Sequence, residues 1–592
     1  MSAAVRASLS ASVSAAFAAL GIAVPPEITL EVPARRDHGD WSTNAALAAA
    51  KAAGRNPRDL ATALADHLTT HPPEHVTKVE IAGPGFINFH LANTWLFDVL
   101  TQVINEGPSY GSVDVGHATS VIVEYVSANP TGPLHAGHAR WAAFGDALSR
   151  VLSKANYQVH KEFYVNDRGV QINHYVASLI ARRDGKEVLA DGYLGQYISE
   201  WAAEMPSGLD DASARAWGLN KAYEYQRDTM ARMHVEFDTW SSEQSIADRG
   251  AVEAALADLT ERGKTYVSVL PRATSDRPDA DTPADGTAPA TWLATTECLN
   301  PKNNKPFDDA DRVLVKGDGQ YTYFMPDIAY HRDKFSRATM LIDILGPDHH
   351  GYVGRMKAAV MCLGHAPQDL EIIIGQNVAL VRNGEEVRMS KRSGDIIELA
   401  EIIDEVGPDV AKLTFLLQSV DTRQTVDLAT LVESRLDNPV HYIHYAHARV
   451  HGIGRKAAEL GVSRAPLSQA QLTLLTAEQE LDLLRSLASL PDVVALAATE
   501  RAPHKVTTWL RELAGSFQSF YAHCPVLATT VSPDLQQARL WLVEAARVGL
   551  SVGLDLLGVS APESMDDLTE AADAAVDAAT DSATDSATDS DN

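Results

Sequence analysis

The sequence has only three cysteines in 592 residues, Cys298, Cys362 and Cys524, and they are far apart along the chain. This spacing offers no closely spaced pair for a metal and no disulfide framework, so a reducing cytoplasm is the expected compartment. Long apolar runs are also lacking, and none approaches the roughly 20 residues that cross a membrane. A hydrophobic content of 45% nevertheless supports large cores, and the length predicts three or four domains.

Basic residues are few, since 50 Lys and Arg face 78 Asp and Glu, for a formal charge of −28. Residues 563–592 hold ten of the acids and no Lys or Arg, which leaves about −18 on the rest of the chain. This segment repeats Ala-Thr-Asp-Ser three times and has little apolar surface, so we expect a disordered tail. The net charge does not exclude nucleic-acid binding, which depends on where basic residues cluster.

The first 26 residues lack acids and are rich in Ala and Ser, a composition that leaves an organelle transit peptide as one alternative. We favour an amphipathic helix instead, because apolar residues recur at helical spacing. They are Val5, Leu9, Val13, Phe17 and Leu20. With the alternating strand 86–90, residues 1–110 predict a small α/β module.

The most informative segment is an apolar strand that runs into a turn and then a helix. Ser120–Tyr125 is β-branched, Asn129–Pro133 is rich in turn residues, and a second strand pattern covers Val159–Val165. An amphipathic stripe lies between the strands, so the segment predicts a βαβ unit. His135, Gly137 and His138 stand where the helix begins, and free backbone N–H groups there favour anionic oxygens. This arrangement predicts a triphosphate site.

A second motif, Val387–Gly394, lies between the strand pattern 370–374 and the helical pattern 396–406. Within it, Met389, Ser390 and Lys391 would form a phosphate clamp, with Lys391 offering charge to departing pyrophosphate. Alone, such a loop would be a solvated basic turn. Together the two motifs resemble the paired His-x-Gly-His and Lys-Met-Ser-Lys signatures of class I aminoacyl-tRNA synthetases.

Within that class the chain resembles arginyl-tRNA synthetase from about Pro33 to about Met565. The segments that carry this resemblance are 38–44, 127–138, 321–331, 346–352 and 438–442. One departure is Arg388, where the family's first Lys often stands, which keeps the charge but alters the phosphate geometry.

The resemblance implies a doubly wound, parallel-sheet, Rossmann-like α/β catalytic domain over 115–425, with insertions and an irregular loop at 275–289. It also implies an N-terminal α/β domain over 1–110 that contacts the corner of the tRNA. The helical patterns after 430 imply an all-helical anticodon-binding bundle over 430–562, followed by the acidic tail over 563–592.

A guanidinium is planar and always charged, so a site that selects it needs carboxylates and other acceptors. By resemblance, the arginine-binding residues are Glu124, Ser127, Asn129, Tyr323, Asp327 and His349. Two structural alternatives stay open: Asp327 as a helix N-cap, and Glu124 as the partner of a buried Lys or Arg.

Cationic and aromatic residues are mixed on one segment of the predicted bundle, where they could stack on and neutralise a bent RNA loop. The candidate tRNA-binding residues are Arg435, His441, Tyr442, Tyr445 and Arg449. An ordinary amphipathic helix would have a similar composition.

The resemblance implies a monomer that joins L-arginine to tRNA(Arg) through an arginyl-adenylate, with ATP as a substrate, Mg²⁺ accompanying it and no structural metal. It also implies that activation needs bound tRNA. Two alternatives remain, a non-catalytic tRNA-binding paralogue and another nucleotidyl transferase.

Overall fold

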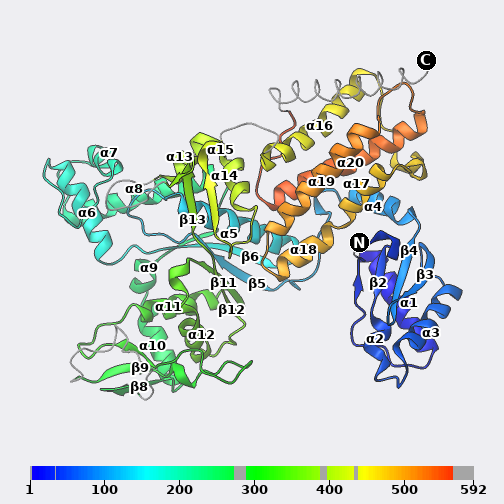
Figure 1. The fold of residues 1–592 in the computed structure, drawn as a ribbon. Helices are drawn as coiled ribbons and strands as arrows, with labels where there is room; N and C mark the ends of the chain where they lie inside the picture. Colours follow the sequence, from blue (N-terminus) through cyan, green and yellow to red (C-terminus); the bar gives the residue numbers. More distant parts are fainter. Residues whose placement is uncertain (1–2, 34, 272–287, 387–396, 432–437, 565–592) are drawn as a thin grey trace.

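The computed structural model describes residues 3–33, 35–271, 288–386, 397–431 and 438–564. A parallel β-sheet forms the centre, a helical bundle lies beside it, and the N-terminal domain stands apart from the sheet (Figure 1). No helix among the described residues has the length and apolar character needed to cross a membrane.

The N-terminal domain is an antiparallel sheet of order β1-β2-β4-β3 with helices packed on it. Its elements are α1 (Ala3–Ala19), β1 (Leu30–Glu31), β2 (Trp41–Thr43), α2 (Ala45–Ala50), α3 (Pro57–Thr70), β3 (Val76–Ala82) and β4 (Phe86–Leu91). Helix α1 buries Leu9, Val13 and Phe17 completely, which confirms the amphipathic helix predicted there. The alternating strand predicted over 86–90 is β4.

The central sheet is entirely parallel and has the order β12-β11-β5-β6-β7. Its strands are β5 (Ser120–Glu124), β6 (Gln158–Val165), β7 (Thr239–Ser242), β11 (Met340–Leu345) and β12 (Leu370–Ile374). The chain builds outward from β5 through β6 to β7, then returns to add β11 on the other side of β5. Ligands of such sheets bind at the carboxyl ends of the strands beside this switch point, and the topology confirms the predicted doubly wound fold.

Helix α5 (Gly137–Lys154) joins β5 to β6, which confirms the βαβ unit. Its Gly145 lies against the Tyr125 ring so closely that an added Cβ would come within 2.1 Å of it. Arg140 is 1% exposed and donates to the carbonyl oxygens of Gln376 and Ser419 at 2.9 and 2.7 Å. Helix α5 is therefore fixed on several sides before any ligand binds.

A buried ion pair connects α5 to α14 (Pro408–Phe415). Lys412 Nζ lies 2.6 Å from Asp146 Oδ2, and both side chains are fully buried. Burial favours the neutral acid, but Lys412 and Arg150 together hold the pKa of Asp146 below its ordinary value. Burial lowers the pKa of Lys412, an effect that the neighbouring Asp146 carboxylate opposes. Gly558, with φ +63°, follows α20 (Pro533–Leu556) and lies against this pair.

Two insertions interrupt the central sheet. The first, between β6 and β7, has its own core and consists of α6 (Val170–Arg183), α7 (Gln196–Glu204) and α8 (Asp211–Arg232). The second comprises α9 (Glu243–Asp248), α10 (Ala251–Glu261) and an antiparallel sheet of β8 (Thr265–Ser268), β9 (Ala290–Leu293) and β10 (Arg312–Val315). All but the last two residues of the loop predicted over 275–289 lie outside the described residues.

Helices α11 (Phe324–Phe335) and α12 (Tyr352–Cys362) flank β11 along the chain. Although Cys298 and Cys362 are far apart along the chain, the fold brings their Sγ atoms to 3.3 Å from each other. Both are buried free thiols, as is Cys524. Their 64-residue separation in sequence gave no sign of this contact.

A smaller sheet and three helices lead from the central sheet to the bundle. They are β13 (Val378–Arg382), β14 (Glu385–Glu386), α13 (Leu399–Val406), α14, β15 (Gln424–Asp427) and α15 (Leu428–Leu431). The bundle consists of α16 (Pro439–Glu459), α17 (Glu478–Ala488), α18 (Leu490–Thr499), α19 (His504–His523) and α20 (Pro533–Leu556). The helical patterns predicted after residue 430 correspond to these helices, and a 3₁₀ turn at Leu472–Leu474 precedes α17.

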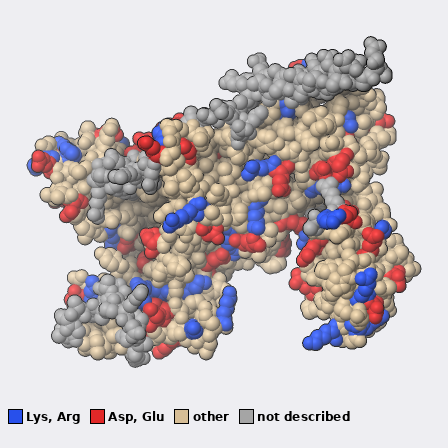
Figure 2. Space-filling view, viewed as in Figure 1, with Lys and Arg blue, Asp and Glu red and all other residues tan. Residues whose placement is uncertain are grey.

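Helix α4 (Thr94–Glu106) packs against α17 and α20 of the bundle. Just beyond it, the Tyr110 hydroxyl donates to the Leu487 carbonyl at 2.8 Å. By packing, the end of the predicted module 1–110 thus belongs with the bundle. The N-terminal domain also contacts the bundle directly, through Arg6 and Asp492 at 2.7 Å. On the face shown in Figure 2, basic and acidic side chains are interspersed over all these parts.

Candidate active site

The chain leaves β5 through a backbone conformation that is rare for these residue types. Val126 and Ser127 have φ values of +70° and +35°, in the left-handed region that β-branched residues avoid. The turn directs the Ser127 hydroxyl back to the strand, where it donates to Glu124 Oε1 at 2.9 Å. The same hydroxyl accepts from the Tyr164 backbone N–H at 3.1 Å. Ser127 therefore joins the carboxyl ends of β5 and β6.

The turn at 129–133 is held by side chains from the first insertion. Gln226 donates from Nε2 to the carbonyls of Asn129 and Gly132 at 3.1 and 2.9 Å. The Tyr197 hydroxyl donates to the Thr131 carbonyl at 2.9 Å. Gly132 has φ +147°, and an added Cβ would lie 2.7 Å from the Tyr197 ring, so glycine is required there. Sequence analysis missed Gln226 and Tyr197, because no motif marks them.

His135 and His138 lie together at the start of α5, with ring centroids 3.9 Å apart. The backbone N–H of Gly137 donates to His135 Nδ1 at 3.1 Å, which leaves the ring proton of neutral His135 on Nε2. His138 Nδ1 donates to the His135 carbonyl at 3.2 Å. A Cβ on Gly137 would lie 2.9 Å from the His135 ring, so the glycine allows this close arrangement.

Residues 397–399, which follow the second motif, contact the first motif. The Ala136 N–H donates to the Ile397 carbonyl at 3.0 Å, and the Leu399 N–H donates to the Leu134 carbonyl at 2.8 Å. These bonds form an antiparallel bridge between His135 and Glu398. Met389, Ser390 and Lys391 themselves lie outside the described residues.

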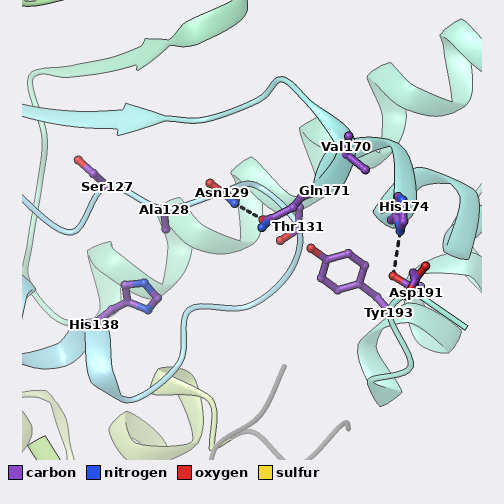
Figure 3. A pocket seen from close by; sticks show the side chains of 11 residues that line it. Ser127, Ala128, Asn129, Thr131, His138, Val170, Gln171, His174, Asp191 and Tyr193 are labelled. Carbon is purple, nitrogen blue, oxygen red and sulfur yellow. Dashed lines mark hydrogen bonds between the residues drawn. The ribbon is translucent and has the colours of Figure 1, made fainter. Parts of the chain in front are cut away.

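A cavity of about 440 Å³ opens between the first motif and the first insertion (Figure 3). It is lined by Ser127, Ala128, Asn129, Thr131, His138, Val170, Gln171, His174, Asp191, Gly192 and Tyr193. Asn129 Nδ2 donates to Gln171 Oε1 at 2.5 Å, and His174 Nδ1 donates to the Asp191 carbonyl at 2.9 Å. The predicted residues Ser127, Asn129 and His138 thus share one cavity, whereas the residues from α6 onward were not foreseen.

Asp327 lies in the first turn of α11, and its carboxylate accepts a 2.5 Å hydrogen bond from the Tyr352 hydroxyl. The N-cap alternative for Asp327 is wrong, because Tyr323 occupies that position. Desolvation raises the pKa of Asp327, an effect that the Tyr352 hydrogen bond opposes. Tyr323 is 87% exposed, and His349 lies on the surface 3.5 Å from Asp348.

Glu124 is buried and its two oxygens have different partners. Ser127 donates to Oε1, and Lys334 Nζ lies 2.7 Å from Oε2. The alternative of a buried pair with a basic residue is therefore confirmed for Glu124. A role in arginine binding remains a prediction, in which this carboxylate would accept a further donor.

The predicted RNA-binding residues of the bundle differ in exposure. Arg449 is 7% exposed and lies between the rings of Tyr445 and Tyr521, with its Cζ 4.3 and 4.2 Å from their centroids. It also donates to Gln518 at 2.9 Å. This packing argues against RNA contact by Tyr445 and Arg449. His441 and Tyr442 are partly exposed, and Arg435 lies outside the described residues.

Three family models match the chain in succession. Residues 4–91 match the arginyl tRNA synthetase N-terminal domain, 99–194 match the catalytic domain of class I (R) tRNA synthetases, and 443–565 match the DALR anticodon binding domain.

Curated relatives cover nearly the whole chain. An arginine–tRNA ligase of Frankia alni is 42% identical over 560 residues, covering 92% of this chain and 96% of the relative. One from Staphylococcus epidermidis is 40% identical, covering 91% and 95%. The Thermus thermophilus arginyl-tRNA synthetase has the same fold, with a TM-score of 0.71 at 22% identity over 95% of this chain and all of that one. This chain therefore belongs to the arginyl-tRNA synthetase family.

Proposed function

We propose that this protein attaches L-arginine to tRNA(Arg) at the expense of ATP, releasing AMP and pyrophosphate. The observation that carries the proposal is the grouping of the paired histidines, the Asn129 turn and the β5 carboxylate at the switch point of the sheet. Family membership supplies the reaction class, and these residues supply a site for it.

ATP would place its phosphates at the start of α5. Neutral His135 presents its protonated Nε2 as a donor, and the positive end of the α5 dipole lies at the same place. The arginine carboxylate attacks the α-phosphate, the bond to pyrophosphate breaks, and arginyl-adenylate forms. A ribose hydroxyl of the terminal tRNA adenosine then attacks the acyl carbon and displaces AMP. Binding and charge stabilisation carry both steps, and Lys391 is proposed to stabilise the departing pyrophosphate.

We assign guanidinium recognition chiefly to Asp327, helped by Glu124. Tyr352 already donates to Asp327 Oδ2, and this bond orients the carboxylate. The planar fork of a guanidinium can donate two parallel hydrogen bonds to one carboxylate, a geometry that an ammonium does not offer. Tyr323, His349, Ser127 and Asn129 remain proposed contacts, with Asn129 near the amino-acid end of the substrate.

The bundle and the N-terminal domain are proposed to hold the tRNA, with His441 and Tyr442 as the candidate contacts that the structure leaves partly exposed. We further propose that the protein acts in the cytoplasm as a monomer. Sedimentation of the purified chain with and without tRNA tests the monomer.

Mg²⁺ is proposed to arrive with ATP, since this ion prefers substrate phosphates and water to all-protein cages. Bound to the phosphates, it would neutralise part of their charge. In the described part of the chain, no group of three or more His, Cys, Asp or Glu side chains could hold a metal ion.

The direct test is transfer of radiolabelled amino acids to unfractionated tRNA. We expect arginine to be charged and the other nineteen not. Binding of tRNA without charging would favour the non-catalytic paralogue, and adenylation of another acid would favour a different nucleotidyl transferase.

We also propose that activation needs bound tRNA. Residues 397–399, which contact the first motif, lead through α13 to α14, and α14 packs on α16 of the bundle. A conformational change that tRNA causes in the bundle can therefore be transmitted to the catalytic site through these packed elements. The coupling free energy between two such sites is typically about 1–3 kcal/mol. Exchange of pyrophosphate into ATP should require arginine and tRNA together. Rapid exchange in ribonuclease-treated enzyme would refute this dependence.

A further inference from the structure

A group of buried charges lies directly beneath the two carboxylates assigned to arginine. Lys334, on α11, is fully buried, and its Nζ lies 2.7 Å from Glu124 Oε2 and 2.6 Å from Asp343 Oδ1. Asp343 stands on β11 beside Glu124 on β5, because the two are paired in the register of the sheet. Lys334 therefore bridges the two strands that flank the switch point.

His331 completes the group from the same helix. Its Nε2 lies 2.8 Å from Asp343 Oδ2, and its Nδ1 lies 2.8 Å from the backbone carbonyl of Asp327. His331 therefore joins Asp343 on β11 to the first turn of α11.

Asp343 is the shared partner of Lys334 and His331. Burial disfavours its charge, but Lys334 and His331 hold the pKa of Asp343 far below its ordinary value. Asp343 and Glu124 hold the pKa of Lys334 above its usual value despite burial. Asp343 thus stays ionised, and its two oxygens connect Lys334 with His331. Lys334 in turn contacts Glu124, and His331 contacts the helical turn that carries Asp327.

We propose that Lys334, Asp343 and His331 form a positioning network that sets the separation and orientation of Glu124 and Asp327, and thereby the affinity for the arginine guanidinium. None of the three needs to touch the substrate. Lys334 fixes the β5 carboxylate, His331 fixes the first turn of α11, and Asp343 keeps the two in register. The inference rests on the proposed function and adds to it the residues that determine arginine specificity.

A buried salt bridge can also serve stability alone, and Lys412 offers a matched control. Like Lys334, it is fully buried with its Nζ 2.6 Å from an Asp oxygen, but its partners are Asp146 and the His234 carbonyl. Loss of either lysine removes a buried cation from an aspartate that keeps a second basic neighbour, Arg150 for Asp146 and His331 for Asp343. Only the loss of Lys334 also removes the basic partner of Glu124.

The experiment compares K334M and K412M in aminoacylation with saturating tRNA. We expect K334M to raise the arginine KM about 10- to 100-fold, the range found when a residue that orients a ligand-binding group is lost. The ATP KM should stay within about threefold of wild type, and K412M should leave both KM values within that limit. Equal increases of both KM values in K334M, or the same pattern in K412M, would show a structural role only and overturn the proposal.

Asp343→Asn provides a second test should K334M not fold. It keeps the size of the side chain and leaves Lys334 paired with Glu124, so the arginine KM should rise selectively but less than in K334M. An arginine KM unchanged in folded D343N would overturn the network. The wild-type control separates the two levels, because a wild-type enzyme that fails to charge arginine contradicts the proposed function itself.

Discussion

Buried cations have different surroundings at the sheet and in the bundle. At the central sheet, Lys334 contacts two carboxylates, and one of them, Glu124, is proposed to help bind arginine. In the bundle, Arg449 lies between two tyrosine rings and contacts Gln518. The first cation arranges groups that can bind a ligand, whereas the second uses its charge and planar face within the core. The role of a buried basic residue therefore depends on its neighbours as well as on its type.

The largest expected effect concerns Asp327, the carboxylate in the first turn of α11. Asp327→Asn should raise the arginine KM far more than the ATP KM, because a guanidinium would lose its ionised partner, at a cost of about 3–5 kcal/mol. Discrimination against citrulline, the uncharged isostere of arginine, should fall in parallel. KM values for both amino acids provide the measurement, and equal changes in the ATP and arginine KM values would contradict the assignment.

A somewhat smaller effect is expected at the second motif. Lys391→Ala should lower the rate by about 10²–10³, the usual cost of losing one preorganised contact to developing charge. Single-turnover adenylate formation measures it, and Lys391→Arg serves as the control that keeps the charge. A near-normal rate in the alanine variant would remove Lys391 from the mechanism.

In the bundle, two variants test whether Arg449 serves stability and Tyr442 serves tRNA binding. Arg449→Met should lower the unfolding free energy by about 2–3 kcal/mol through the loss of two cation–π contacts, while tRNA affinity stays unchanged. Tyr442→Ala should leave the unfolding free energy unchanged and weaken tRNA binding, by about 1–3 kcal/mol if a base stacks on this ring. Urea denaturation and filter binding measure the two effects. A weaker tRNA complex with R449M would show that the buried arginine reaches RNA.

The next prediction concerns the pH dependence of arginine binding at Asp327. Only ionised Asp327 pairs with a guanidinium, and desolvation raises its pKa, so arginine affinity should fall on acidification at a higher pH than for an ordinary carboxyl group. Binding in that range should release a proton. Calorimetry in buffers of different ionisation enthalpy detects this release, and proton uptake would exclude Asp327 as the titrating group.

The smallest effect is expected at the C-terminus. Glu563 still contacts the bundle, since its carbonyl accepts from Arg455 at 2.9 Å, so the truncation should follow Ser564. Removing 565–592 should leave Tm and aminoacylation nearly unchanged, because the segment has little apolar surface, and loss of its acids would at most strengthen tRNA binding slightly. Thermal melting decides the matter, with a loss of several degrees showing that the tail packs on the body.

The sheet edge was predictable because topology and residue type agree there. A β-branched strand, a turn and an amphipathic helix allow few arrangements, so the location of His135 and His138 at the start of α5 followed from the pattern. Gln226 and the Lys334 network were not predictable, since they come from remote segments without periodic or motif signals. Their positions depend on how insertions and strands pack in three dimensions.

Helix α16 shows what the sequence pattern could not predict. Tyr445 and Arg449 are one helical turn apart, and the same spacing is typical of a stacking surface for RNA and of a polar contact inside a bundle. The residues that decide between these, Tyr521 and Gln518, lie on α19. Sequence spacing within one helix cannot reveal a partner on another.

The closure of Gly558 over the Lys412–Asp146 pair has an evolutionary consequence. A Cβ at Gly558 would lie 2.3 Å from Lys412 Nζ and 2.5 Å from Asp146 Oδ2, in a backbone conformation with φ +63°. No side chain fits there while both charged groups keep their places. Across the family, then, these three positions should be inherited together, and a lineage that gains a side chain at 558 should also have replaced the ion pair.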